Sequence, residues 1–222
     1  ATFVPPLPDD LPDALADWEA FVNTPGELPT LIRAGLMHYQ FETIHPFLDG
    51  NGRIGRLLIN LMLAEEGRLT QPVLYLSGYF ESHRPAYYER LQRVREAGEI
   101  EEWLQFFLLA VKEQADDACA RSVRLVAIRE RYLSVASAAR SSLPLLVSML
   151  FRNPFVTVKG VQHGCGLTNQ GSRNLIGRAV ELGWLTPLGG SGRGGRLIWV
   201  ADEIFRVIEA PLAYGTERAE TV

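Results

Sequence analysis

Apolar residues recur every three or four positions through the first part of the chain. Two segments, residues 10–23 and 28–42, show this spacing most clearly. Because an α-helix has 3.6 residues per turn, both segments are predicted to be amphipathic helices, and Gly26 and Pro29 mark the break between them. The apolar faces carry Leu11, Leu15, Trp18 and Val22 in the first helix, and Leu28, Leu31, Ile32, Leu36 and Tyr39 in the second.

The run from Ile54 to Ala64 is different, because it is apolar nearly all round. It has helical length and contains no proline, so it is predicted to be the central, buried helix of a bundle. Two more helices are predicted at about residues 84–97 and 100–115, with Gly98 as the stop signal between them.

The last third of the chain predicts shorter elements. Residues 143–152 and 158–163 are predicted to be short helices, and Thr168 is a candidate N-cap for a third. Two short strands, at about residues 184–188 and 197–200, flank a glycine-rich tip, and a final helix follows. The inner face of the third helix is predicted to carry Leu175, Ile176, Ala179 and Leu182. The fold class is therefore mainly α, a helical bundle followed by a small α+β domain.

Composition narrows the class of protein. A chain of 222 residues with 47% hydrophobic content can bury one large core, or one core and a smaller second one. No apolar run reaches the roughly 18 residues that span a bilayer, and no signal-like segment opens the chain. We therefore expect a cytoplasmic protein with no membrane partner. Cys119 and Cys165 have no metal-ligand spacing, so neither a disulfide framework nor a zinc site is predicted.

Charge divides the chain into unlike parts. Residues 1–120 carry 9 basic and 19 acidic side chains, whereas residues 121–200 carry 11 basic and 2 acidic ones. Opposed charges of this kind indicate different partners for the two parts.

A cluster of polar residues interrupts the apolar flanks between residues 45 and 56. Gly50, Asn51 and Gly52 can adopt backbone angles that point successive N–H groups into one concavity, where an anion binds. The helix predicted to follow would place this concavity at its amino end, which favours phosphate. The surrounding string is His-Pro-Phe-Leu-Asp-Gly-Asn-Gly-Arg-Ile-Gly-Arg, so His45, Asp49, Arg53 and Arg56 share the segment.

This string resembles the Fic family signature, His-Pro-Phe-x-Asp/Glu-Gly-Asn-Gly-Arg-x-x-Arg, at every fixed position. The resemblance implies a Fic-type helical bundle and a protein adenylyltransferase, which moves AMP from ATP to a Ser, Thr or Tyr hydroxyl of a target protein and releases pyrophosphate. The related Doc branch, which phosphorylates its target, has Lys where this chain has Gly52. ATP as substrate and Mg²⁺ are the implied small molecules.

The same resemblance implies a role for each motif residue. His45 is the general base, which suits a side chain that titrates near working pH. Asp49 ligates Mg²⁺, and the amides of Gly50 to Gly52 with the Asn51 side chain hold the α- and β-phosphates. Arg53 and Arg56 pair with the outer phosphates. The catalytic set is His45, Asn51 and Arg53, and the nucleotide-binding set is Gly50, Asn51, Gly52, Arg53 and Arg56. Phe47 is expected to fill the core beneath the loop.

The predicted order of three helices, hairpin and helix resembles a winged helix-turn-helix domain. We therefore expect a Fic core at residues 1–120, a helical connector at 121–140, this winged domain at 141–212 and a flexible tail at 213–222. The resemblance implies DNA contacts from the third helix and the wing. The contact residues would be Asn169, Gln170, Ser172, Arg173, Arg193 and Arg196. The alternative is a unit used for homodimer formation or for docking the target.

Other hypotheses for the function of the whole chain stay open. One is a DNA-binding transcriptional regulator whose Fic core senses a nucleotide. Another is a transferase whose nucleotide donor is GTP, UTP or a CDP-linked group instead of ATP, because the motif binds phosphates and does not select a base. In the family, a target-clamping hairpin precedes a Pro-rich run like Pro5–Pro8, so residues 1–4 are expected to be its second strand. No segment fits the family's inhibitory pattern Ser/Thr-x-x-x-Glu-Gly/Asn, so autoinhibition by the given residues is not expected.

Overall fold

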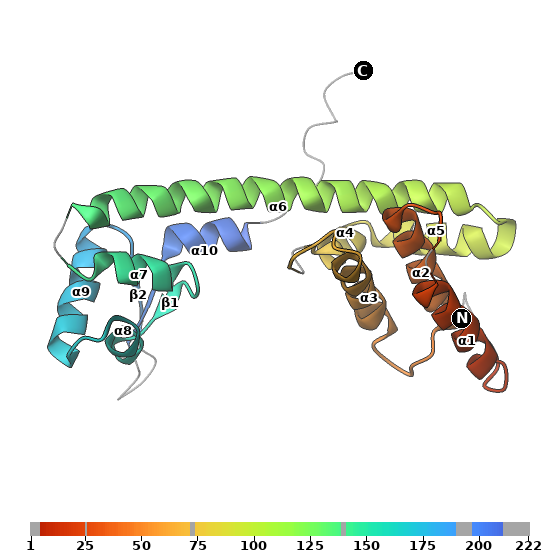
Figure 1. The fold of residues 1–222 in the computed structure, drawn as a ribbon, viewed down its shortest axis with the longest axis horizontal. Coiled ribbons are helices and arrows are strands. Elements are labelled where there is room, and N and C mark those ends of the chain that lie inside the picture. Colours follow the sequence, from red (N-terminus) through yellow and green to blue (C-terminus); the bar gives the residue numbers. More distant parts are fainter. Residues whose placement is uncertain (1–4, 25, 72–73, 139–140, 190–196, 211–222) are drawn as a thin grey trace, which may run out of the picture. The chain divides into compact units, whose positions relative to one another are not determined.

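The computed structural model describes residues 5–24, 26–71, 74–138, 141–189 and 197–210 (Figure 1). These residues form ten helices and one three-stranded sheet, which confirms the prediction of a mainly α chain with a small α+β part. The chain divides between residues 118 and 119 into two compact units, and each contains its own hydrophobic cluster. The division lies within a single long helix, α6 (Ile100–Ser137).

The first unit is entirely helical over its described residues. Besides the first half of α6, its helices are α1 (Leu11–Asn23), α2 (Thr30–Ile44), α3 (Asn51–Glu65), α4 (Leu76–Ser82) and α5 (Arg84–Ala97). The predicted helices at 84–97 and on either side of Gly26 are present, and Gly98 ends α5 with a left-handed φ of 72°. Helix α4 was not predicted, and the helix predicted at about residues 100–115 continues as α6 to Ser137, through most of the expected helical connector at 121–140.

The core of the first unit is built from α2, α3, α4, α5 and the start of α6. Trp103 and Phe107 of α6 are completely buried, and the Trp103 indole donates a hydrogen bond to the carbonyl of Gly35 at 3.0 Å. Gly35 is required there, because a methyl group on it would lie 2.9 Å from a methyl of Leu104. This close packing fixes α2, whose carboxyl end leads into the polar loop.

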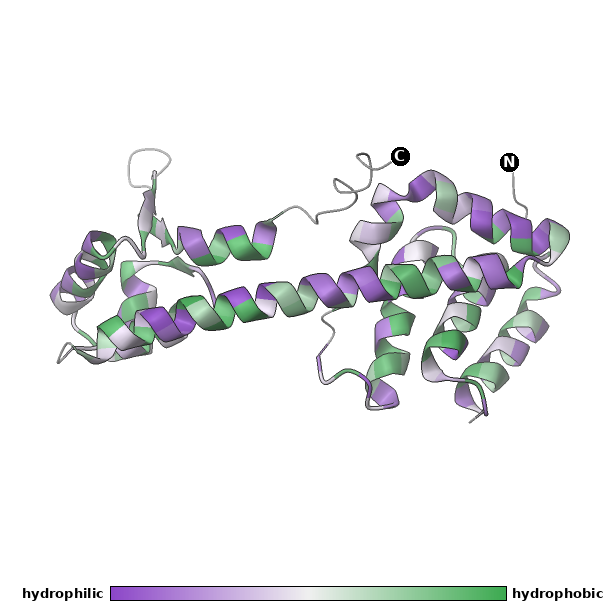
Figure 2. Cartoon of the chain, turned by 90° about the horizontal axis from the view of Figure 1, so that it is seen from above, coloured by the Kyte–Doolittle hydropathy of each residue, from purple (hydrophilic) through white to green (hydrophobic). Residues whose placement is uncertain are grey.

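Helix α3 is not buried all round, contrary to the sequence prediction. Its inner face carries Gly55, Ile59 and Met62, whereas Leu57 and Leu61 are more than half exposed. Apolar composition alone did not show which side of the helix faces solvent. Figure 2 shows hydrophilic and hydrophobic residues interleaved along the helices, and none of the helices in the described residues is long and apolar enough to cross a membrane.

The second unit combines helices with a small antiparallel sheet. Its elements are the second half of α6, α7 (Leu143–Leu150), β1 (Phe155–Val156), α8 (Val158–Cys165), α9 (Asn169–Glu181), β2 (Thr186–Leu188), β3 (Ile198–Val200) and α10 (Asp202–Glu209). The strand order is β1-β3-β2, with Phe155 opposite Val200 and Leu188 opposite Ile198. The predicted N-cap is confirmed, because the Thr168 hydroxyl accepts a hydrogen bond from the Gly171 amide at 3.1 Å.

The identity of this unit as a winged helix stays a prediction. The short strand β1 was not predicted, and the glycine-rich tip at residues 190–196 lies outside the described residues. The expected tail at 213–222 and the expected hairpin strand at 1–4 also lie outside them.

Candidate functional site

The loop between α2 and α3 begins at His45, which has an unusual backbone. Its φ of 50° and ψ of 55° are left-handed, and among the described residues no other non-glycine residue has a positive φ. The His45 amide donates to the Phe41 carbonyl at 2.9 Å and so closes α2. A left-handed conformation costs an L-residue about 1–2 kcal/mol. This turn ends α2 and leaves the His45 side chain 40% exposed.

Helix α3 starts at Asn51, three residues earlier than the sequence predicted. Gly50 is its N-cap, with a φ of 89° that glycine adopts without strain, and the Gly50 carbonyl accepts from the Ile54 amide at 3.0 Å. The amides of Asn51, Gly52 and Arg53 therefore belong to the first turn, where a helix offers them no acceptor. The dipole and these N–H groups favour an anion at this end of α3.

The Asn51 side chain fixes the loop. It is 2% exposed, its amide nitrogen donates to the Phe47 carbonyl at 2.6 Å, and its oxygen accepts from the Phe47 amide at 2.9 Å. The backbone thus occupies the oxygen and one N–H of this side chain, and the phosphate contact expected of Asn51 stays a prediction. Phe47 differs from its prediction, since its ring is 48% exposed and does not fill the core.

Two arginines flank the amino end of α3. Arg53 lies at the surface and pairs with the Asp49 carboxylate at 3.1 Å. Arg56 donates from Nε to the Ser77 hydroxyl of α4 at 2.8 Å. Gly52 makes room for this arginine, because a methyl group there would lie 3.0 Å from Arg56 Nη1. Guanidinium groups in these positions can meet phosphate oxygens two at a time.

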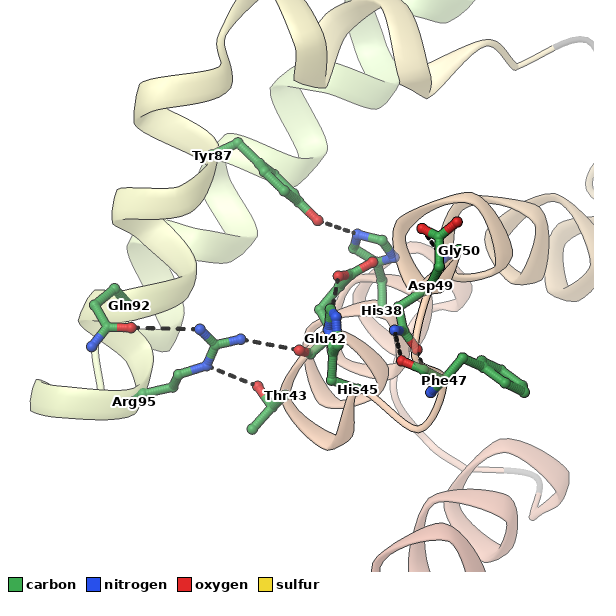
Figure 3. A network of polar contacts seen from close by, with 11 residues as sticks. His38, Glu42, Thr43, His45, Phe47, Asp49, Gly50, Tyr87, Gln92 and Arg95 are labelled. Carbon is green, nitrogen blue, oxygen red and sulfur yellow. Dashed lines mark hydrogen bonds and ion pairs between the residues drawn. The ribbon is translucent and has the colours of Figure 1, made fainter. Parts of the chain in front are cut away.

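Buried titratable groups lie directly behind His45 (Figure 3). Glu42, one turn earlier on α2, is buried, and its Oε2 lies 4.0 Å from His45 Nδ1. Burial raises the pKa of the Glu42 carboxyl. His38 is completely buried, its Nε2 lies 3.1 Å from the Tyr87 hydroxyl, and burial lowers the pKa of His38 to about 4. His38 is therefore neutral near pH 7.

Sequence reasoning missed His38, Glu42 and Ser77. A sequence signal for His38 and Glu42 was available. Residues 38, 42 and 45 follow one another at intervals of one helical turn, and His38 and Glu42 are polar residues within an otherwise apolar helix face. No sequence signal marked Ser77, since its contact with Arg56 spans 21 residues.

Two hollows lie beside the arginines. One has a volume of about 260 Å³ and the other about 210 Å³, and Arg56, Tyr75 and Ser77 line both. The first also contacts Arg53, and the second is bordered by Tyr87 and Tyr88. Aromatic side chains and hydroxyl groups of this kind can receive the sugar and base of a nucleotide.

The only motif carboxylate suited to a metal is that of Asp49. Within the described part of the chain, no three His, Cys, Asp or Glu side chains gather into a metal-binding group. The Asp49 side chain is largely exposed, and its Oδ1 accepts from the Gly50 amide at 2.7 Å. This fits Mg²⁺, which is commonly held by one or two carboxylates together with substrate phosphates and water.

In the second unit, the predicted DNA contacts do not all face solvent. Ser172 is completely buried and donates to the Thr168 carbonyl at 2.9 Å, so the prediction of a DNA contact is wrong for this residue. Asn169, Gln170 and Arg173 are exposed. Arg173 Nε donates to the Asn169 side chain at 3.0 Å, and both line a hollow of about 510 Å³. Arg193 and Arg196 lie outside the described residues.

Comparison with known proteins finds a family match for the first 63 residues of the chain. Residues 1–63 match the family described as Fic/DOC, which confirms the resemblance predicted from residues 45–56. Protein adenylyltransferase Fic of Culex quinquefasciatus is 35% identical over 105 residues, 46% of this chain and 20% of that protein. A probable protein adenylyltransferase of Aquifex aeolicus (strain VF5) is 34% identical over 86 residues, 39% of this chain and 27% of that protein.

The chain thus spans between 20% and 27% of the length of these relatives. A solved Fic family protein from Desulfovibrio desulfuricans G20 has a TM-score of 0.49 and 23% identity, over 89% of this chain and 56% of that protein. The family match ends at residue 63, so it does not bear on the second unit.

Proposed function

We propose that this chain, whose residues 1–63 match the Fic/DOC family, is a protein adenylyltransferase that moves AMP from ATP to a Ser, Thr or Tyr hydroxyl of a target protein. The observation that carries the proposal is that one short loop presents His45 beside the amino end of α3 and its two arginines. A base and an anion site held together in this way suit the transfer of a phosphorus-containing group to a hydroxyl.

The proposed reaction is a direct displacement. His45 takes the hydroxyl proton while the hydroxyl oxygen forms a bond to the α-phosphorus. The bond from the α-phosphorus to the bridging oxygen breaks, and pyrophosphate leaves. The first amides of α3 stabilise the charge that develops on the phosphate oxygens.

The arginines hold the leaving group. Arg56, fixed by Ser77, is placed to bind the outer phosphates, and Arg53 can leave its exposed pair with Asp49 to do the same. Asp49 would hold a magnesium ion, which neutralises phosphate charge when it is bound. The hollows shared by Tyr75 and Ser77 would receive the sugar and base.

The test separates transfer of AMP from transfer of phosphate. The chain is incubated with Mg²⁺, a cell lysate and ATP labelled on either the α- or the γ-phosphorus. Protein labelled only by α-labelled ATP supports the proposal, and labelling only by γ-labelled ATP contradicts it. Competition by unlabelled GTP, UTP or a CDP-linked donor identifies a different base preference.

His45→Ala is the decisive variant. We expect a loss of about 10²–10⁴ in transfer rate with ATP affinity changed less than about twofold, because His45 meets the hydroxyl and the phosphates are held elsewhere. Arg56→Ala is the contrasting variant and should weaken ATP binding as well as rate. Calorimetric titration gives the affinities. A His45→Ala protein that keeps more than half its activity would remove His45 from the mechanism.

A second activity, binding of duplex DNA by the second unit, is favoured by a separate observation. No acidic residue occurs between Glu130 and Glu181, while Lys159 and Arg173 lie in this stretch. Both line the 510 Å³ hollow between α8 and α9, together with His163. Within the described residues, neither Lys159 nor Arg173 forms an ion pair. Uncompensated cations beside exposed amide side chains suit phosphate and base contacts.

Salt dependence tests this activity. We expect the affinity for duplex DNA to fall steeply as salt rises, and Arg173→Ala to weaken binding and reduce sequence preference. Arg178→Ala is the matched control, since it removes the same charge from the other end of α9, where Arg178 pairs with Glu181 at 3.4 Å. If fluorescence anisotropy of the full chain shows no binding at low salt, this unit instead docks a protein or forms a homodimer.

A further inference from the structure

We propose that Glu42 is a positioning residue for His45: its buried carboxylate orients the imidazole through Nδ1 and leaves Nε2 to face the attacking hydroxyl. The inference deepens the proposed function and rests on it. Its first support is the placement of the two residues. Glu42 lies in the last turn of α2, His45 directly follows the helix, and Glu42 Oε2 lies 4.0 Å from His45 Nδ1 (Figure 3).

The carboxylate makes no hydrogen bond that would explain it as part of the core. Glu42 is 8% exposed, and its buried Oε1 has no hydrogen-bond partner in the described part of the chain. Within the described residues, Oε2 forms an ion pair with His45 and no hydrogen bond. A buried carboxylate without such partners weakens folding. Residues that break a packing rule in this way are expected at functional sites.

The neighbours of Glu42 keep the carboxylate where it is. On the α3 side, a methyl group on Gly55 would lie 2.8 Å from Glu42 Oε1 and 3.1 Å from His38 Nδ1, so the helix approaches both side chains closely. On the α5 side, Arg95 donates to the Glu42 backbone carbonyl at 3.2 Å and to the Thr43 hydroxyl at 3.2 Å. These contacts anchor the end of α2 through its backbone and leave the carboxylate free for His45.

Titratable groups from three helices and the loop surround the carboxylate. They are His45 at the end of α2, neutral His38 on α2, Arg56 on α3, and Arg95 and Tyr87 on α5. Burial raises the pKa of Glu42, and the nearby His45, Arg56 and Arg95 counteract this. Because Glu42 Oε2 lies 4.0 Å from His45 Nδ1, the carboxylate is placed to stabilise the imidazolium that forms when His45 takes the hydroxyl proton.

The kinetic test uses Glu42→Gln in the full chain. We expect kcat to fall about 10–100-fold, as for other groups that orient a functional histidine, with KM for ATP within about twofold. Glu42→Asp, which keeps a shorter carboxylate, should recover part of the loss. Glu89→Gln is the control, because it removes an exposed carboxylate from α5 and should leave kcat unchanged.

The second readout does not need transfer activity. The ¹⁵N NMR spectrum of histidine-labelled protein at one fixed pH reports which ring nitrogen of His45 carries the proton. Loss of the carboxylate beside Nδ1 should lower the fraction of His45 protonated on Nδ1 in Glu42→Gln, but not in Glu89→Gln. If the wild-type chain transfers no AMP, the proposed function fails and this spectrum still decides whether Glu42 orients the imidazole.

Two results would overturn the inference. One is a Glu42→Gln protein with kcat and the His45 ring ¹⁵N spectrum both unchanged. The other is a variant whose KM, circular dichroism and melting temperature all change together with kcat and are not recovered by Glu42→Asp, which would show a purely structural role.

Discussion

Single contacts set the position of the residues that would handle a nucleotide. The oxygen and nitrogen of the Asn51 side chain both form hydrogen bonds with the backbone of Phe47. The Ser77 hydroxyl accepts a hydrogen bond from Arg56 Nε. Neither residue needs to touch the substrate to matter. Because an oriented guanidinium binds phosphate with less loss of side-chain entropy, the partner of Arg56 is expected to affect affinity.

Ser77→Ala should therefore weaken ATP binding. The variant removes the acceptor of Arg56 Nε, so the guanidinium must be ordered when ATP binds; ordering a long side chain costs about 0.5–1.5 kcal/mol, and we expect affinity to fall roughly two- to tenfold. Calorimetric titration measures it. Ser82→Ala is the matched control on the same helix, because the Ser82 hydroxyl donates to the Tyr79 carbonyl one turn back. Equal affinities in the two variants would show that Ser77 does not position Arg56.

At the scale of elements, periodicity located helices better than it located their ends. The face of α9 and its Thr168 cap were predictable, because both depend on neighbours in sequence. Helix α4 was missed because seven residues hold too few repeats for a pattern. The length of α6 could have been inferred, since residues 100–142 contain no Gly or Pro to end a helix.

The candidate site shows the same limit. The string from His45 to Arg56 identified the loop, the anion-binding end of α3 and both arginines. The string did not include Glu42, although its spacing of three residues from His45 is a local signal. It could not show that α3 approaches the Glu42 carboxylate and His38 closely at Gly55, because that approach is a property of packing rather than of local sequence.

At the scale of the whole molecule, the two units have separate cores as well as opposite charge. One cluster contains Trp103 and Phe107, and the other contains Leu146 and Trp184, which stacks on Tyr132 at 4.5 Å. Since no residue belongs to both clusters, each unit should respond to changes in its own core.

Phe107→Ala tests this independence. Removing a fully buried ring should destabilise the first unit by about 3–5 kcal/mol and leave the second nearly unchanged. Hydrogen exchange followed by mass spectrometry in increasing urea reports each unit through its own peptides. Leu146→Ala, at a fully buried position of the other cluster, should give the reverse pattern. Equal loss of protection in both units would show that they unfold as one.

The left-handed backbone of His45 sets a limit on engineering. Glycine accepts that conformation freely, so exchanging this histidine for glycine relieves local strain in the loop while removing the proposed base. A screen that selects only for a higher melting temperature would then favour His45→Gly. At this position, a substitution that raises stability lowers activity. Engineering for thermostability should therefore keep His45 and introduce stabilising substitutions at other positions.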